Sequence, residues 1–235
     1  CENKIKIKIN FVYAKKILSQ SWFLILSGLM VTLYMQIDKV MLGKLMTDKA
    51  EVGIYSAATA VAGMWYFIPL AIITAYRPII MKKKKDNNDD YLKTVQLLYT
   101  IITWTGIFFG IFILFLSNPI ILILYGSEYE KANNILSISI WAGTFAMLGS
   151  AREPWLISEG LQRYSIFYIG IGAVVNIILN YLLIPILGGY GAALATLVTQ
   201  IITSIVAPFF FRETRYSSIM MLKSFVFCGL KKKSN

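Results

Sequence analysis

The sequence contains no histidine, only two cysteines and few charged residues. The missing histidine removes the most common general base and metal ligand of proteins. The two cysteines, Cys1 and Cys228, stand at opposite ends of the chain and offer neither a disulfide framework nor a metal cluster. These shortages argue against hydrolytic and metal-dependent chemistry. We therefore predict no catalytic residue, no metal site and no cofactor.

Long apolar runs dominate the sequence instead. Hydrophobic residues make up 57% of the chain, charged residues 15%, and the mean hydropathy is +0.64, a balance that the surface of a soluble domain would not tolerate. Six runs approach the ~20 residues that cross a bilayer. We predict an all-α, polytopic membrane helical bundle of six transmembrane helices. The expected spans are 21–44, 53–80, 92–116, 132–157, 166–187 and 191–211.

Proline and glycine mark the expected ends of these helices. Pro78 closes the second span, Asn118 and Pro119 break the third, and Pro185 ends the fifth. The apolar segment after Pro119 is too short to cross and is expected as an elbow in the membrane interface. The glycines from Gly188 to Gly191 predict a tight turn between the last two spans.

The basic residues lie between the apolar runs and set the orientation. The net charge is +11, but its lysines and arginines concentrate on one side of the six-span arrangement. The positive-inside rule places that side, with both termini, in the cytoplasm. The chain then divides into a basic cytoplasmic segment 1–20, the transmembrane part 21–211 and a basic tail 212–235. We expect these charges to meet anionic membrane lipid and not nucleic acid.

Two groups of polar residues inside the spans are candidate site residues. Asp38 lies in the first span, beside Lys39 and on the same helix face as Tyr34, and an aspartate inside a membrane helix indicates a functional site. The alternative is that both charges simply reach the interface, because they lie near the end of the span. Asn176 and Asn180 are one helical turn apart and face the same way, either for hydrogen bonds between helices or for a ligand.

Three motifs resemble one family of membrane proteins. The pattern N-x3-N-x4-P-x2-G-x2-GAA-x2-T, from Asn176 to Thr196, resembles a signature of bacterial oligosaccharide-lipid flippases of the polysaccharide transporter family. That family belongs to the multidrug/oligosaccharidyl-lipid/polysaccharide exporter superfamily. The stretches IDK, LG and VGIYSAA between Ile37 and Ala58 resemble the first hairpin of the family's second half. The stretch LYG from Leu124 to Gly126 resembles its elbow.

The resemblance implies a function and an origin. Such a transporter would flip isoprenyl-diphosphate-linked oligosaccharide units across the bacterial inner membrane for O-antigen, lipopolysaccharide or capsule biosynthesis, coupled to protons or sodium. Family members have twelve or more helices in two halves, so the chain resembles the C-terminal half, and a missing N-terminal half is an expected partner. One alternative is a cation antiporter of the multidrug and toxin extrusion type. Another is a membrane polysaccharide polymerase or acyltransferase.

The resemblance implies that Arg152 and Glu153 are candidate substrate-binding residues. Arg152 lies about 10 Å inside the cytoplasmic end of the fourth span, and a guanidinium can hold a diphosphate through two hydrogen bonds. The alternative is that the helix leaves the membrane at Ala151 and that Arg152 pairs with Glu153 or with lipid head groups. The sequence leaves both interpretations open.

Overall fold

The computed structural model describes residues 36–87 and 89–226. The basic segment 1–20, Tyr34 and most of the first expected span lie outside the described residues, as does the end of the basic tail. The chain divides into two compact units, 1–37 and 38–235. All described residues from Asp38 onward belong to the second unit, which forms the helical bundle.

Every regular element in the described part of the chain is helical, which confirms the predicted all-α class. Residues 36–45 form a helix. The elements that come after it are α2 (Ala50–Gly63), η1 (Met64–Tyr66), α3 (Phe67–Lys85), α4 (Tyr91–Tyr125), η2 (Ser127–Tyr129), α5 (Ala132–Ala151), α6 (Glu153–Ser158), α7 (Arg163–Ile201), the π-helical η3 (Ile202–Val206), η4 (Ala207–Phe210) and α8 (Arg215–Ser224).

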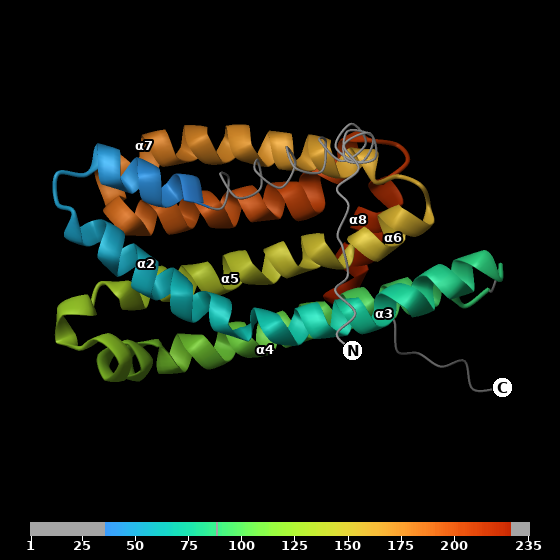
Figure 1. The fold of residues 1–235 in the computed structure, drawn as a ribbon, viewed down its shortest axis with the longest axis horizontal. Coiled ribbons are helices and arrows are strands. Elements are labelled where there is room, and N and C mark those ends of the chain that lie inside the picture. Colours follow the sequence, from blue (N-terminus) through green and yellow to red (C-terminus); the bar gives the residue numbers. More distant parts are fainter. Residues whose placement is uncertain (1–35, 88, 227–235) are drawn as a thin grey trace, which may run out of the picture. The chain divides into compact units, whose positions relative to one another are not determined.

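Four described helical stretches are long and apolar enough to cross a membrane. They are Ala50–Lys85, Tyr91–Tyr125, Ala132–Ser158 and Arg163–Phe210. The last is broken at Gly188, whose backbone has φ 57° and ψ −136°, so α7 folds back on itself at the predicted turn (Figure 1). A side chain on Gly191 would clash with the Leu183 carbonyl, which shows how tightly the two limbs turn. The total of six spans stays a prediction.

Two of the three predicted helix breaks at proline are wrong. Pro78 lies inside α3 and Pro119 inside α4, and both helices continue for several residues beyond their prolines. Pro185 lies three residues before the break at Gly188, where the first limb of α7 ends close to the predicted end of the fifth span. An internal proline costs ~3 kcal/mol, whereas opening a helix in apolar surroundings leaves backbone groups unpaired at several kcal/mol each. The expected elbow after Pro119 is therefore mostly helix. The helix α4 ends only before Gly126, where φ is 85°.

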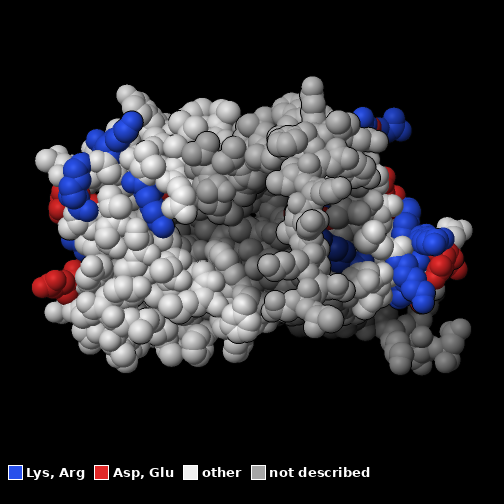
Figure 2. Space-filling view, viewed as in Figure 1, with Lys and Arg blue, Asp and Glu red and all other residues white. Residues whose placement is uncertain are grey.

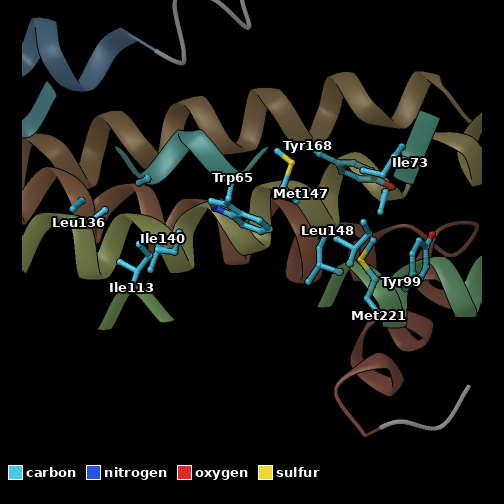
Figure 3. Close-up of a cluster of buried hydrophobic side chains, with 14 of the residues drawn as sticks. Trp65, Ile73, Tyr99, Ile113, Leu136, Ile140, Met147, Leu148, Tyr168 and Met221 are labelled. Carbon is cyan, nitrogen blue, oxygen red and sulfur yellow. The ribbon is translucent and has the colours of Figure 1, made fainter. Parts of the chain in front are cut away.

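Close contact between α4 and α5 holds the middle of the bundle. A side chain on Gly106 would clash with Thr144, and one on Gly110 would lie 2.9 Å from the Trp141 ring. Small residues that let helix backbones approach are typical of helix packing in membranes. Figure 3 shows the apolar cluster on either side of this contact, from Leu136 and Ile140 to Leu148 and Met221.

The charged side chains gather near the two ends of the long helices, on the face drawn in Figure 2. One end carries Lys82 to Lys85 in the last turn of α3, and α6 and α8 lie at the same end (Figure 1). The other end carries the turn at Gly188 and the short connection between α4 and α5. We call these the lysine-rich end and the turn end.

We predict that the Gly106 contact is essential for stability. Gly106→Ala should lower the midpoint of thermal unfolding in detergent, because overpacking costs ~1–3 kcal/mol. Gly170→Ala is the matched control, since nothing lies within 4 Å of a side chain at that helical position. It should leave the midpoint unchanged or raise it. Equal midpoints for the two variants would contradict the tight packing.

Candidate functional site

The carboxylate of Asp38 is the centre of a buried polar cluster. Its Oδ1 accepts a hydrogen bond from Asn180 Nδ2 at 2.6 Å. Its Oδ2 accepts one from Tyr55 Oη at 2.8 Å and one from Thr196 Oγ1 at 2.7 Å. Asp38 is only 7% exposed. We call these residues, together with Asn176, the Asp38 cluster.

The break in α7 explains why two of these donors meet. Asn180 lies eight residues before Gly188 and Thr196 eight residues after it. Because each helical residue rises ~1.5 Å, both side chains stand about 12 Å from the turn, one on each limb. The hairpin therefore brings them to the same depth, where Asp38 accepts from both. The third donor is Tyr55, which lies in α2.

The amide of Asn180 has a fixed orientation. Its Nδ2 donates to Asp38 and, at 3.0 Å, to Oδ1 of Asn176, so both amide hydrogens are used. Its own Oδ1 is buried without a hydrogen-bond partner. The one-turn spacing of Asn176 and Asn180 thus does put both residues on one face, where they extend the cluster.

Among the described residues, the hydrogen-bond donors to the Asp38 carboxylate are all neutral. The structure records no ion pair between Asp38 and any described basic residue. Lys39 is partly exposed and makes no hydrogen bond or ion pair with another described residue. A buried charge is costly unless it is hydrogen-bonded, and bonds to a charged acceptor contribute ~1.5–3 kcal/mol each. The three donors therefore offset the cost of burying Asp38.

Glu51 holds the turn on which this geometry depends. Its Oε2 accepts the backbone N–H of Gly189 at 2.9 Å, immediately after the break. Its Oε1 lies 3.6 Å from Nζ of Lys131, whose side chain is mostly exposed. Glu51 precedes Tyr55 by one turn of α2, so both residues face the α7 hairpin. A pocket of about 460 Å³ opens beside Glu51, lined also by Lys131, Asn134, Ile135, Ile186, Leu187 and Tyr190.

Arg152 is the second buried charge, and it lies at the joint between α5 and α6. It is 1% exposed. Its Nε donates to Ser217 Oγ at 3.0 Å, and its Nη2 donates to the Ser204 carbonyl and lies 3.0 Å from Met221 Sδ. The guanidinium carbon is 5.6 Å from the centre of the Tyr168 ring. All of these partners are neutral.

The irregular end of α7 explains why the Ser204 carbonyl is available. In a regular α-helix this carbonyl would accept the N–H of residue 208, but that residue is Pro208 and has no N–H. The backbone here adopts a π-helix from Ile202 to Val206. π-helical turns often occur at functional sites. Arg152 supplies the donor that Pro208 lacks.

Arg152 does not pair with Glu153, which corrects one of the two expected interpretations. Glu153 pairs with Arg77 at 2.9 Å, and both of those side chains are about half exposed. Adjacent residues on a helix point about 100° apart and do not face each other. The same interpretation had the helix leave the membrane at Ala151. The helix α5 ends there and α6 begins at Glu153, while the place where the chain leaves the membrane stays a prediction.

Several residues that these sites use were not predicted from the sequence. Tyr55 lies within the motif from Val52 to Ala58, and Thr196 ends the motif that begins at Asn176. The equal spacing of Asn180 and Thr196 around Gly188 could have paired those two residues. Glu51 and Ser217 had no such signal, because Glu51 follows an exposed loop and Ser217 lies in a segment that was expected to be a basic cytoplasmic tail.

An apolar helical bundle with polar side chains buried between its helices is typical of polytopic integral membrane proteins. In the described part of the chain, no three His, Cys, Asp or Glu side chains come together as a metal site requires. The MatE family model matches residues 24–182, so the chain belongs to the MatE family. It is a multi-pass membrane protein, and the family indicates a transporter and not an enzyme.

One curated relative carries a functional name. The chain is 26% identical over 196 residues to a protein of Haloferax volcanii named "probable low-salt glycan biosynthesis flippase Agl15". The match covers 80% of this chain but 40% of the relative, so the chain spans two fifths of that protein's length. No solved structure matches. Together, the family and this relative support the predicted exporter superfamily.

We predict that Glu51 stabilises the bundle through its hydrogen bond to Gly189 and not through its charge. Glu51→Ala should lower the thermal midpoint in detergent, because an unpaired buried N–H costs ~1–3 kcal/mol. Glu51→Gln should keep most of the stability, since the amide oxygen still accepts, and an ion pair to an exposed lysine contributes only ~0–1 kcal/mol. Glu128→Ala, at an exposed position of the turn end, is the control. Equal losses in the Ala and Gln variants would assign the effect to charge.

Proposed function

We propose that this chain forms part of a transporter that flips isoprenyl-diphosphate-linked oligosaccharides across the bacterial cytoplasmic membrane for O-antigen or capsule biosynthesis. The Asp38 cluster carries the proposal, because it places a carboxylate, two amides and two hydroxyls inside an apolar bundle. The likeness to a protein named as a glycan biosynthesis flippase supports the substrate class.

The physical requirement of such transport is a set of replacement hydrogen bonds. A sugar hydroxyl that enters hydrocarbon without a partner loses several kcal/mol. A polar cavity between two helical halves supplies partners, while the lipid tail stays in the bilayer. The chain spans two fifths of its relative's length. From the motifs that resemble the second half of the family, we propose that it supplies the C-terminal half and acts with an N-terminal half.

Asp38 is proposed as the coupling group of this transporter. Its carboxylate has no described basic partner, and the buried Oδ1 of Asn180 beside it accepts no hydrogen bond. Oxygen atoms of this kind bind protons or hard cations such as sodium. Binding of a cation would neutralise the carboxylate and change the hydrogen bonds that join α2 to the α7 hairpin.

The same observation favours a second candidate, a multidrug and toxin extrusion-type cation antiporter. Lys39, the neighbour of Asp38 in the sequence, would disfavour an organic cation if it paired with the carboxylate. The three recorded partners of the Asp38 carboxylate are neutral instead. The two candidates differ in substrate, so transport of a lipid-linked glycan and efflux of an organic cation distinguish them.

Labelling from the two sides of the membrane tests the proposed orientation. Asn87 follows the lysines of α3, and Glu128 follows the far end of α4; both are exposed. The 35 residues of α4 extend about 52 Å, which exceeds the ~30 Å hydrocarbon layer. With Cys1 and Cys228 replaced by serine, an impermeant thiol reagent should label Glu128→Cys from outside intact cells and Asn87→Cys only after lysis. Labelling of both from outside would contradict the proposed orientation.

Substitution of Asp38 tests its role in transport. In the complete transporter, Asp38→Asn should reduce glycan export by at least about tenfold while the amount of protein in the membrane stays the same, because the amide cannot carry the coupling charge. Asp48→Asn makes the same chemical change at an exposed loop position and should export normally. Normal export by Asp38→Asn would exclude the coupling role. Loss of organic cation efflux, with glycan export intact, would favour the antiporter.

A further inference from the structure

Arg152 is a buried cation that no described anion neutralises. The structure records no ion pair between Arg152 and any described acidic residue, and its hydrogen bonds end on a hydroxyl, a carbonyl and a sulfur. A buried charge usually has an oppositely charged partner or a functional role. Two of its contacts, Ser217 and Met221, come from one element, the C-terminal helix α8. Removal of α8 would therefore take away two of the recorded partners.

Helix α8 contacts the bundle through neutral hydrogen bonds and through the buried side chains of Met220 and Met221. Ser217 Oγ is 3.1 Å from Tyr99 Oη, and Ser224 Oγ is 2.6 Å from Thr103 Oγ1. Gln96 donates to the Met220 carbonyl at 2.9 Å. Figure 3 shows Tyr99 and Met221 at the same end of the apolar cluster. Water can replace each of these polar contacts, since a neutral hydrogen bond contributes only ~0.5–1.5 kcal/mol net.

The contact surface of α8 is also imperfectly satisfied. The hydroxyl of Ser218 is fully buried and has no hydrogen-bond partner. An unpaired buried polar group weakens the packed state, because water would pair with it when the helix lifts away. With α8 packed on the bundle, the Arg152 guanidinium thus has no described anionic partner and the Ser218 hydroxyl has no hydrogen-bond partner. Both would be satisfied if α8 moved and an anion took its place beside Arg152.

We propose that Arg152 is a covered anion site, that α8 is its cover, and that a diphosphate group replaces Ser217 and Met221 at the guanidinium. A planar guanidinium binds two phosphate oxygens at once. The site lies at the lysine-rich end (Figure 1). The choice of a diphosphate rests on the proposed function, whereas the covered cation itself rests on the contacts of Arg152 alone.

The exposure of Ser218 to a thiol reagent measures whether α8 lifts. The chain, with Cys1 and Cys228 replaced by serine and Ser218→Cys as reporter, is placed in phosphatidylcholine nanodiscs. Because the Ser218 hydroxyl makes no hydrogen bond, this change removes no recorded contact. Labelling by a maleimide should be slow, several-fold faster with farnesyl diphosphate, and unchanged with farnesol, which has the same isoprenyl chain without the diphosphate. No acceleration by farnesyl diphosphate would overturn the proposal.

Two variants test whether Arg152 is the group that binds both α8 and the anion. Arg152→Gln should label about tenfold faster without ligand, as loss of hydrogen bonds from a charged donor implies, and should no longer respond to farnesyl diphosphate. Ser217→Ala removes only the acceptor of Nε. It should label somewhat faster and still respond. Slow labelling of both variants would overturn the proposal.

Two further measurements separate the lifting of α8 from a general loosening of the bundle and from the binding of a lipid phosphate. A reporter at Ser139→Cys, buried on α5, should stay slow throughout. If Arg152→Gln accelerates this reporter too, the bundle has loosened, and the response of Ser217→Ala to farnesyl diphosphate decides the proposal.

In phosphatidylglycerol nanodiscs without ligand, labelling as fast as with farnesyl diphosphate would overturn the assignment to a diphosphate in favour of a lipid phosphate. None of these measurements requires glycan transport, so they can fail or succeed independently of the proposed flippase activity.

Discussion

The fold depends on the need to satisfy one carboxylate buried between apolar helices. Asp38 obtains its three donors from α2 and from both limbs of α7, so these elements must meet at one point. That requirement explains the break at Gly188, the equal distances of Asn180 and Thr196 from it, and the bond from Glu51 to the N–H of Gly189. A bilayer offers no water to replace a missing donor. A change in the geometry of the turn would therefore directly change the hydrogen bonds to the Asp38 carboxylate.

The charges of this protein fall into two kinds with different consequences. The ion pairs of Arg77 with Glu153 and of Lys84 with Glu159 lie at the lysine-rich end with side chains between 24% and 57% exposed, and solvent-accessible ion pairs contribute only ~0–1 kcal/mol each. The side chains of Asp38 and Arg152 are buried, and every described residue that bonds to either of them is neutral. Two opposite buried charges would neutralise each other and serve the structure. A single buried charge with neutral partners can still bind an ion. This difference separates the two candidate sites from the rest of the polar residues.

Local features of the sequence predicted local features of the structure. The helical class followed from apolar runs of sufficient length, and the turn at Gly188 followed from glycines that permit a positive φ. The predicted break at Pro119 failed because the surroundings of that residue penalise an open backbone more than a proline in a helix. The contact of Asp38 with Asn180 joins residues 142 positions apart, which no spacing rule can predict. The burial of Arg152 depends on α8, whose serines and basic residues resemble a solvated tail in composition.

The last hairpin links the two sites because it is irregular at both ends. At the turn end, the break at Gly188 exposes a backbone N–H to Glu51, and at the lysine-rich end Pro208 leaves the Ser204 carbonyl to Arg152. Irregular backbone within a membrane protein persists where protein or a cavity satisfies its polar groups. Thr196 and Ser204 lie on the same limb, eight residues apart, one bonded to Asp38 and the other to Arg152. A contiguous helical limb is a physical route through which two sites can be coupled when it has two discrete arrangements. A displacement of this limb that changes the bond to Asp38 consequently also displaces the carbonyl that holds Arg152.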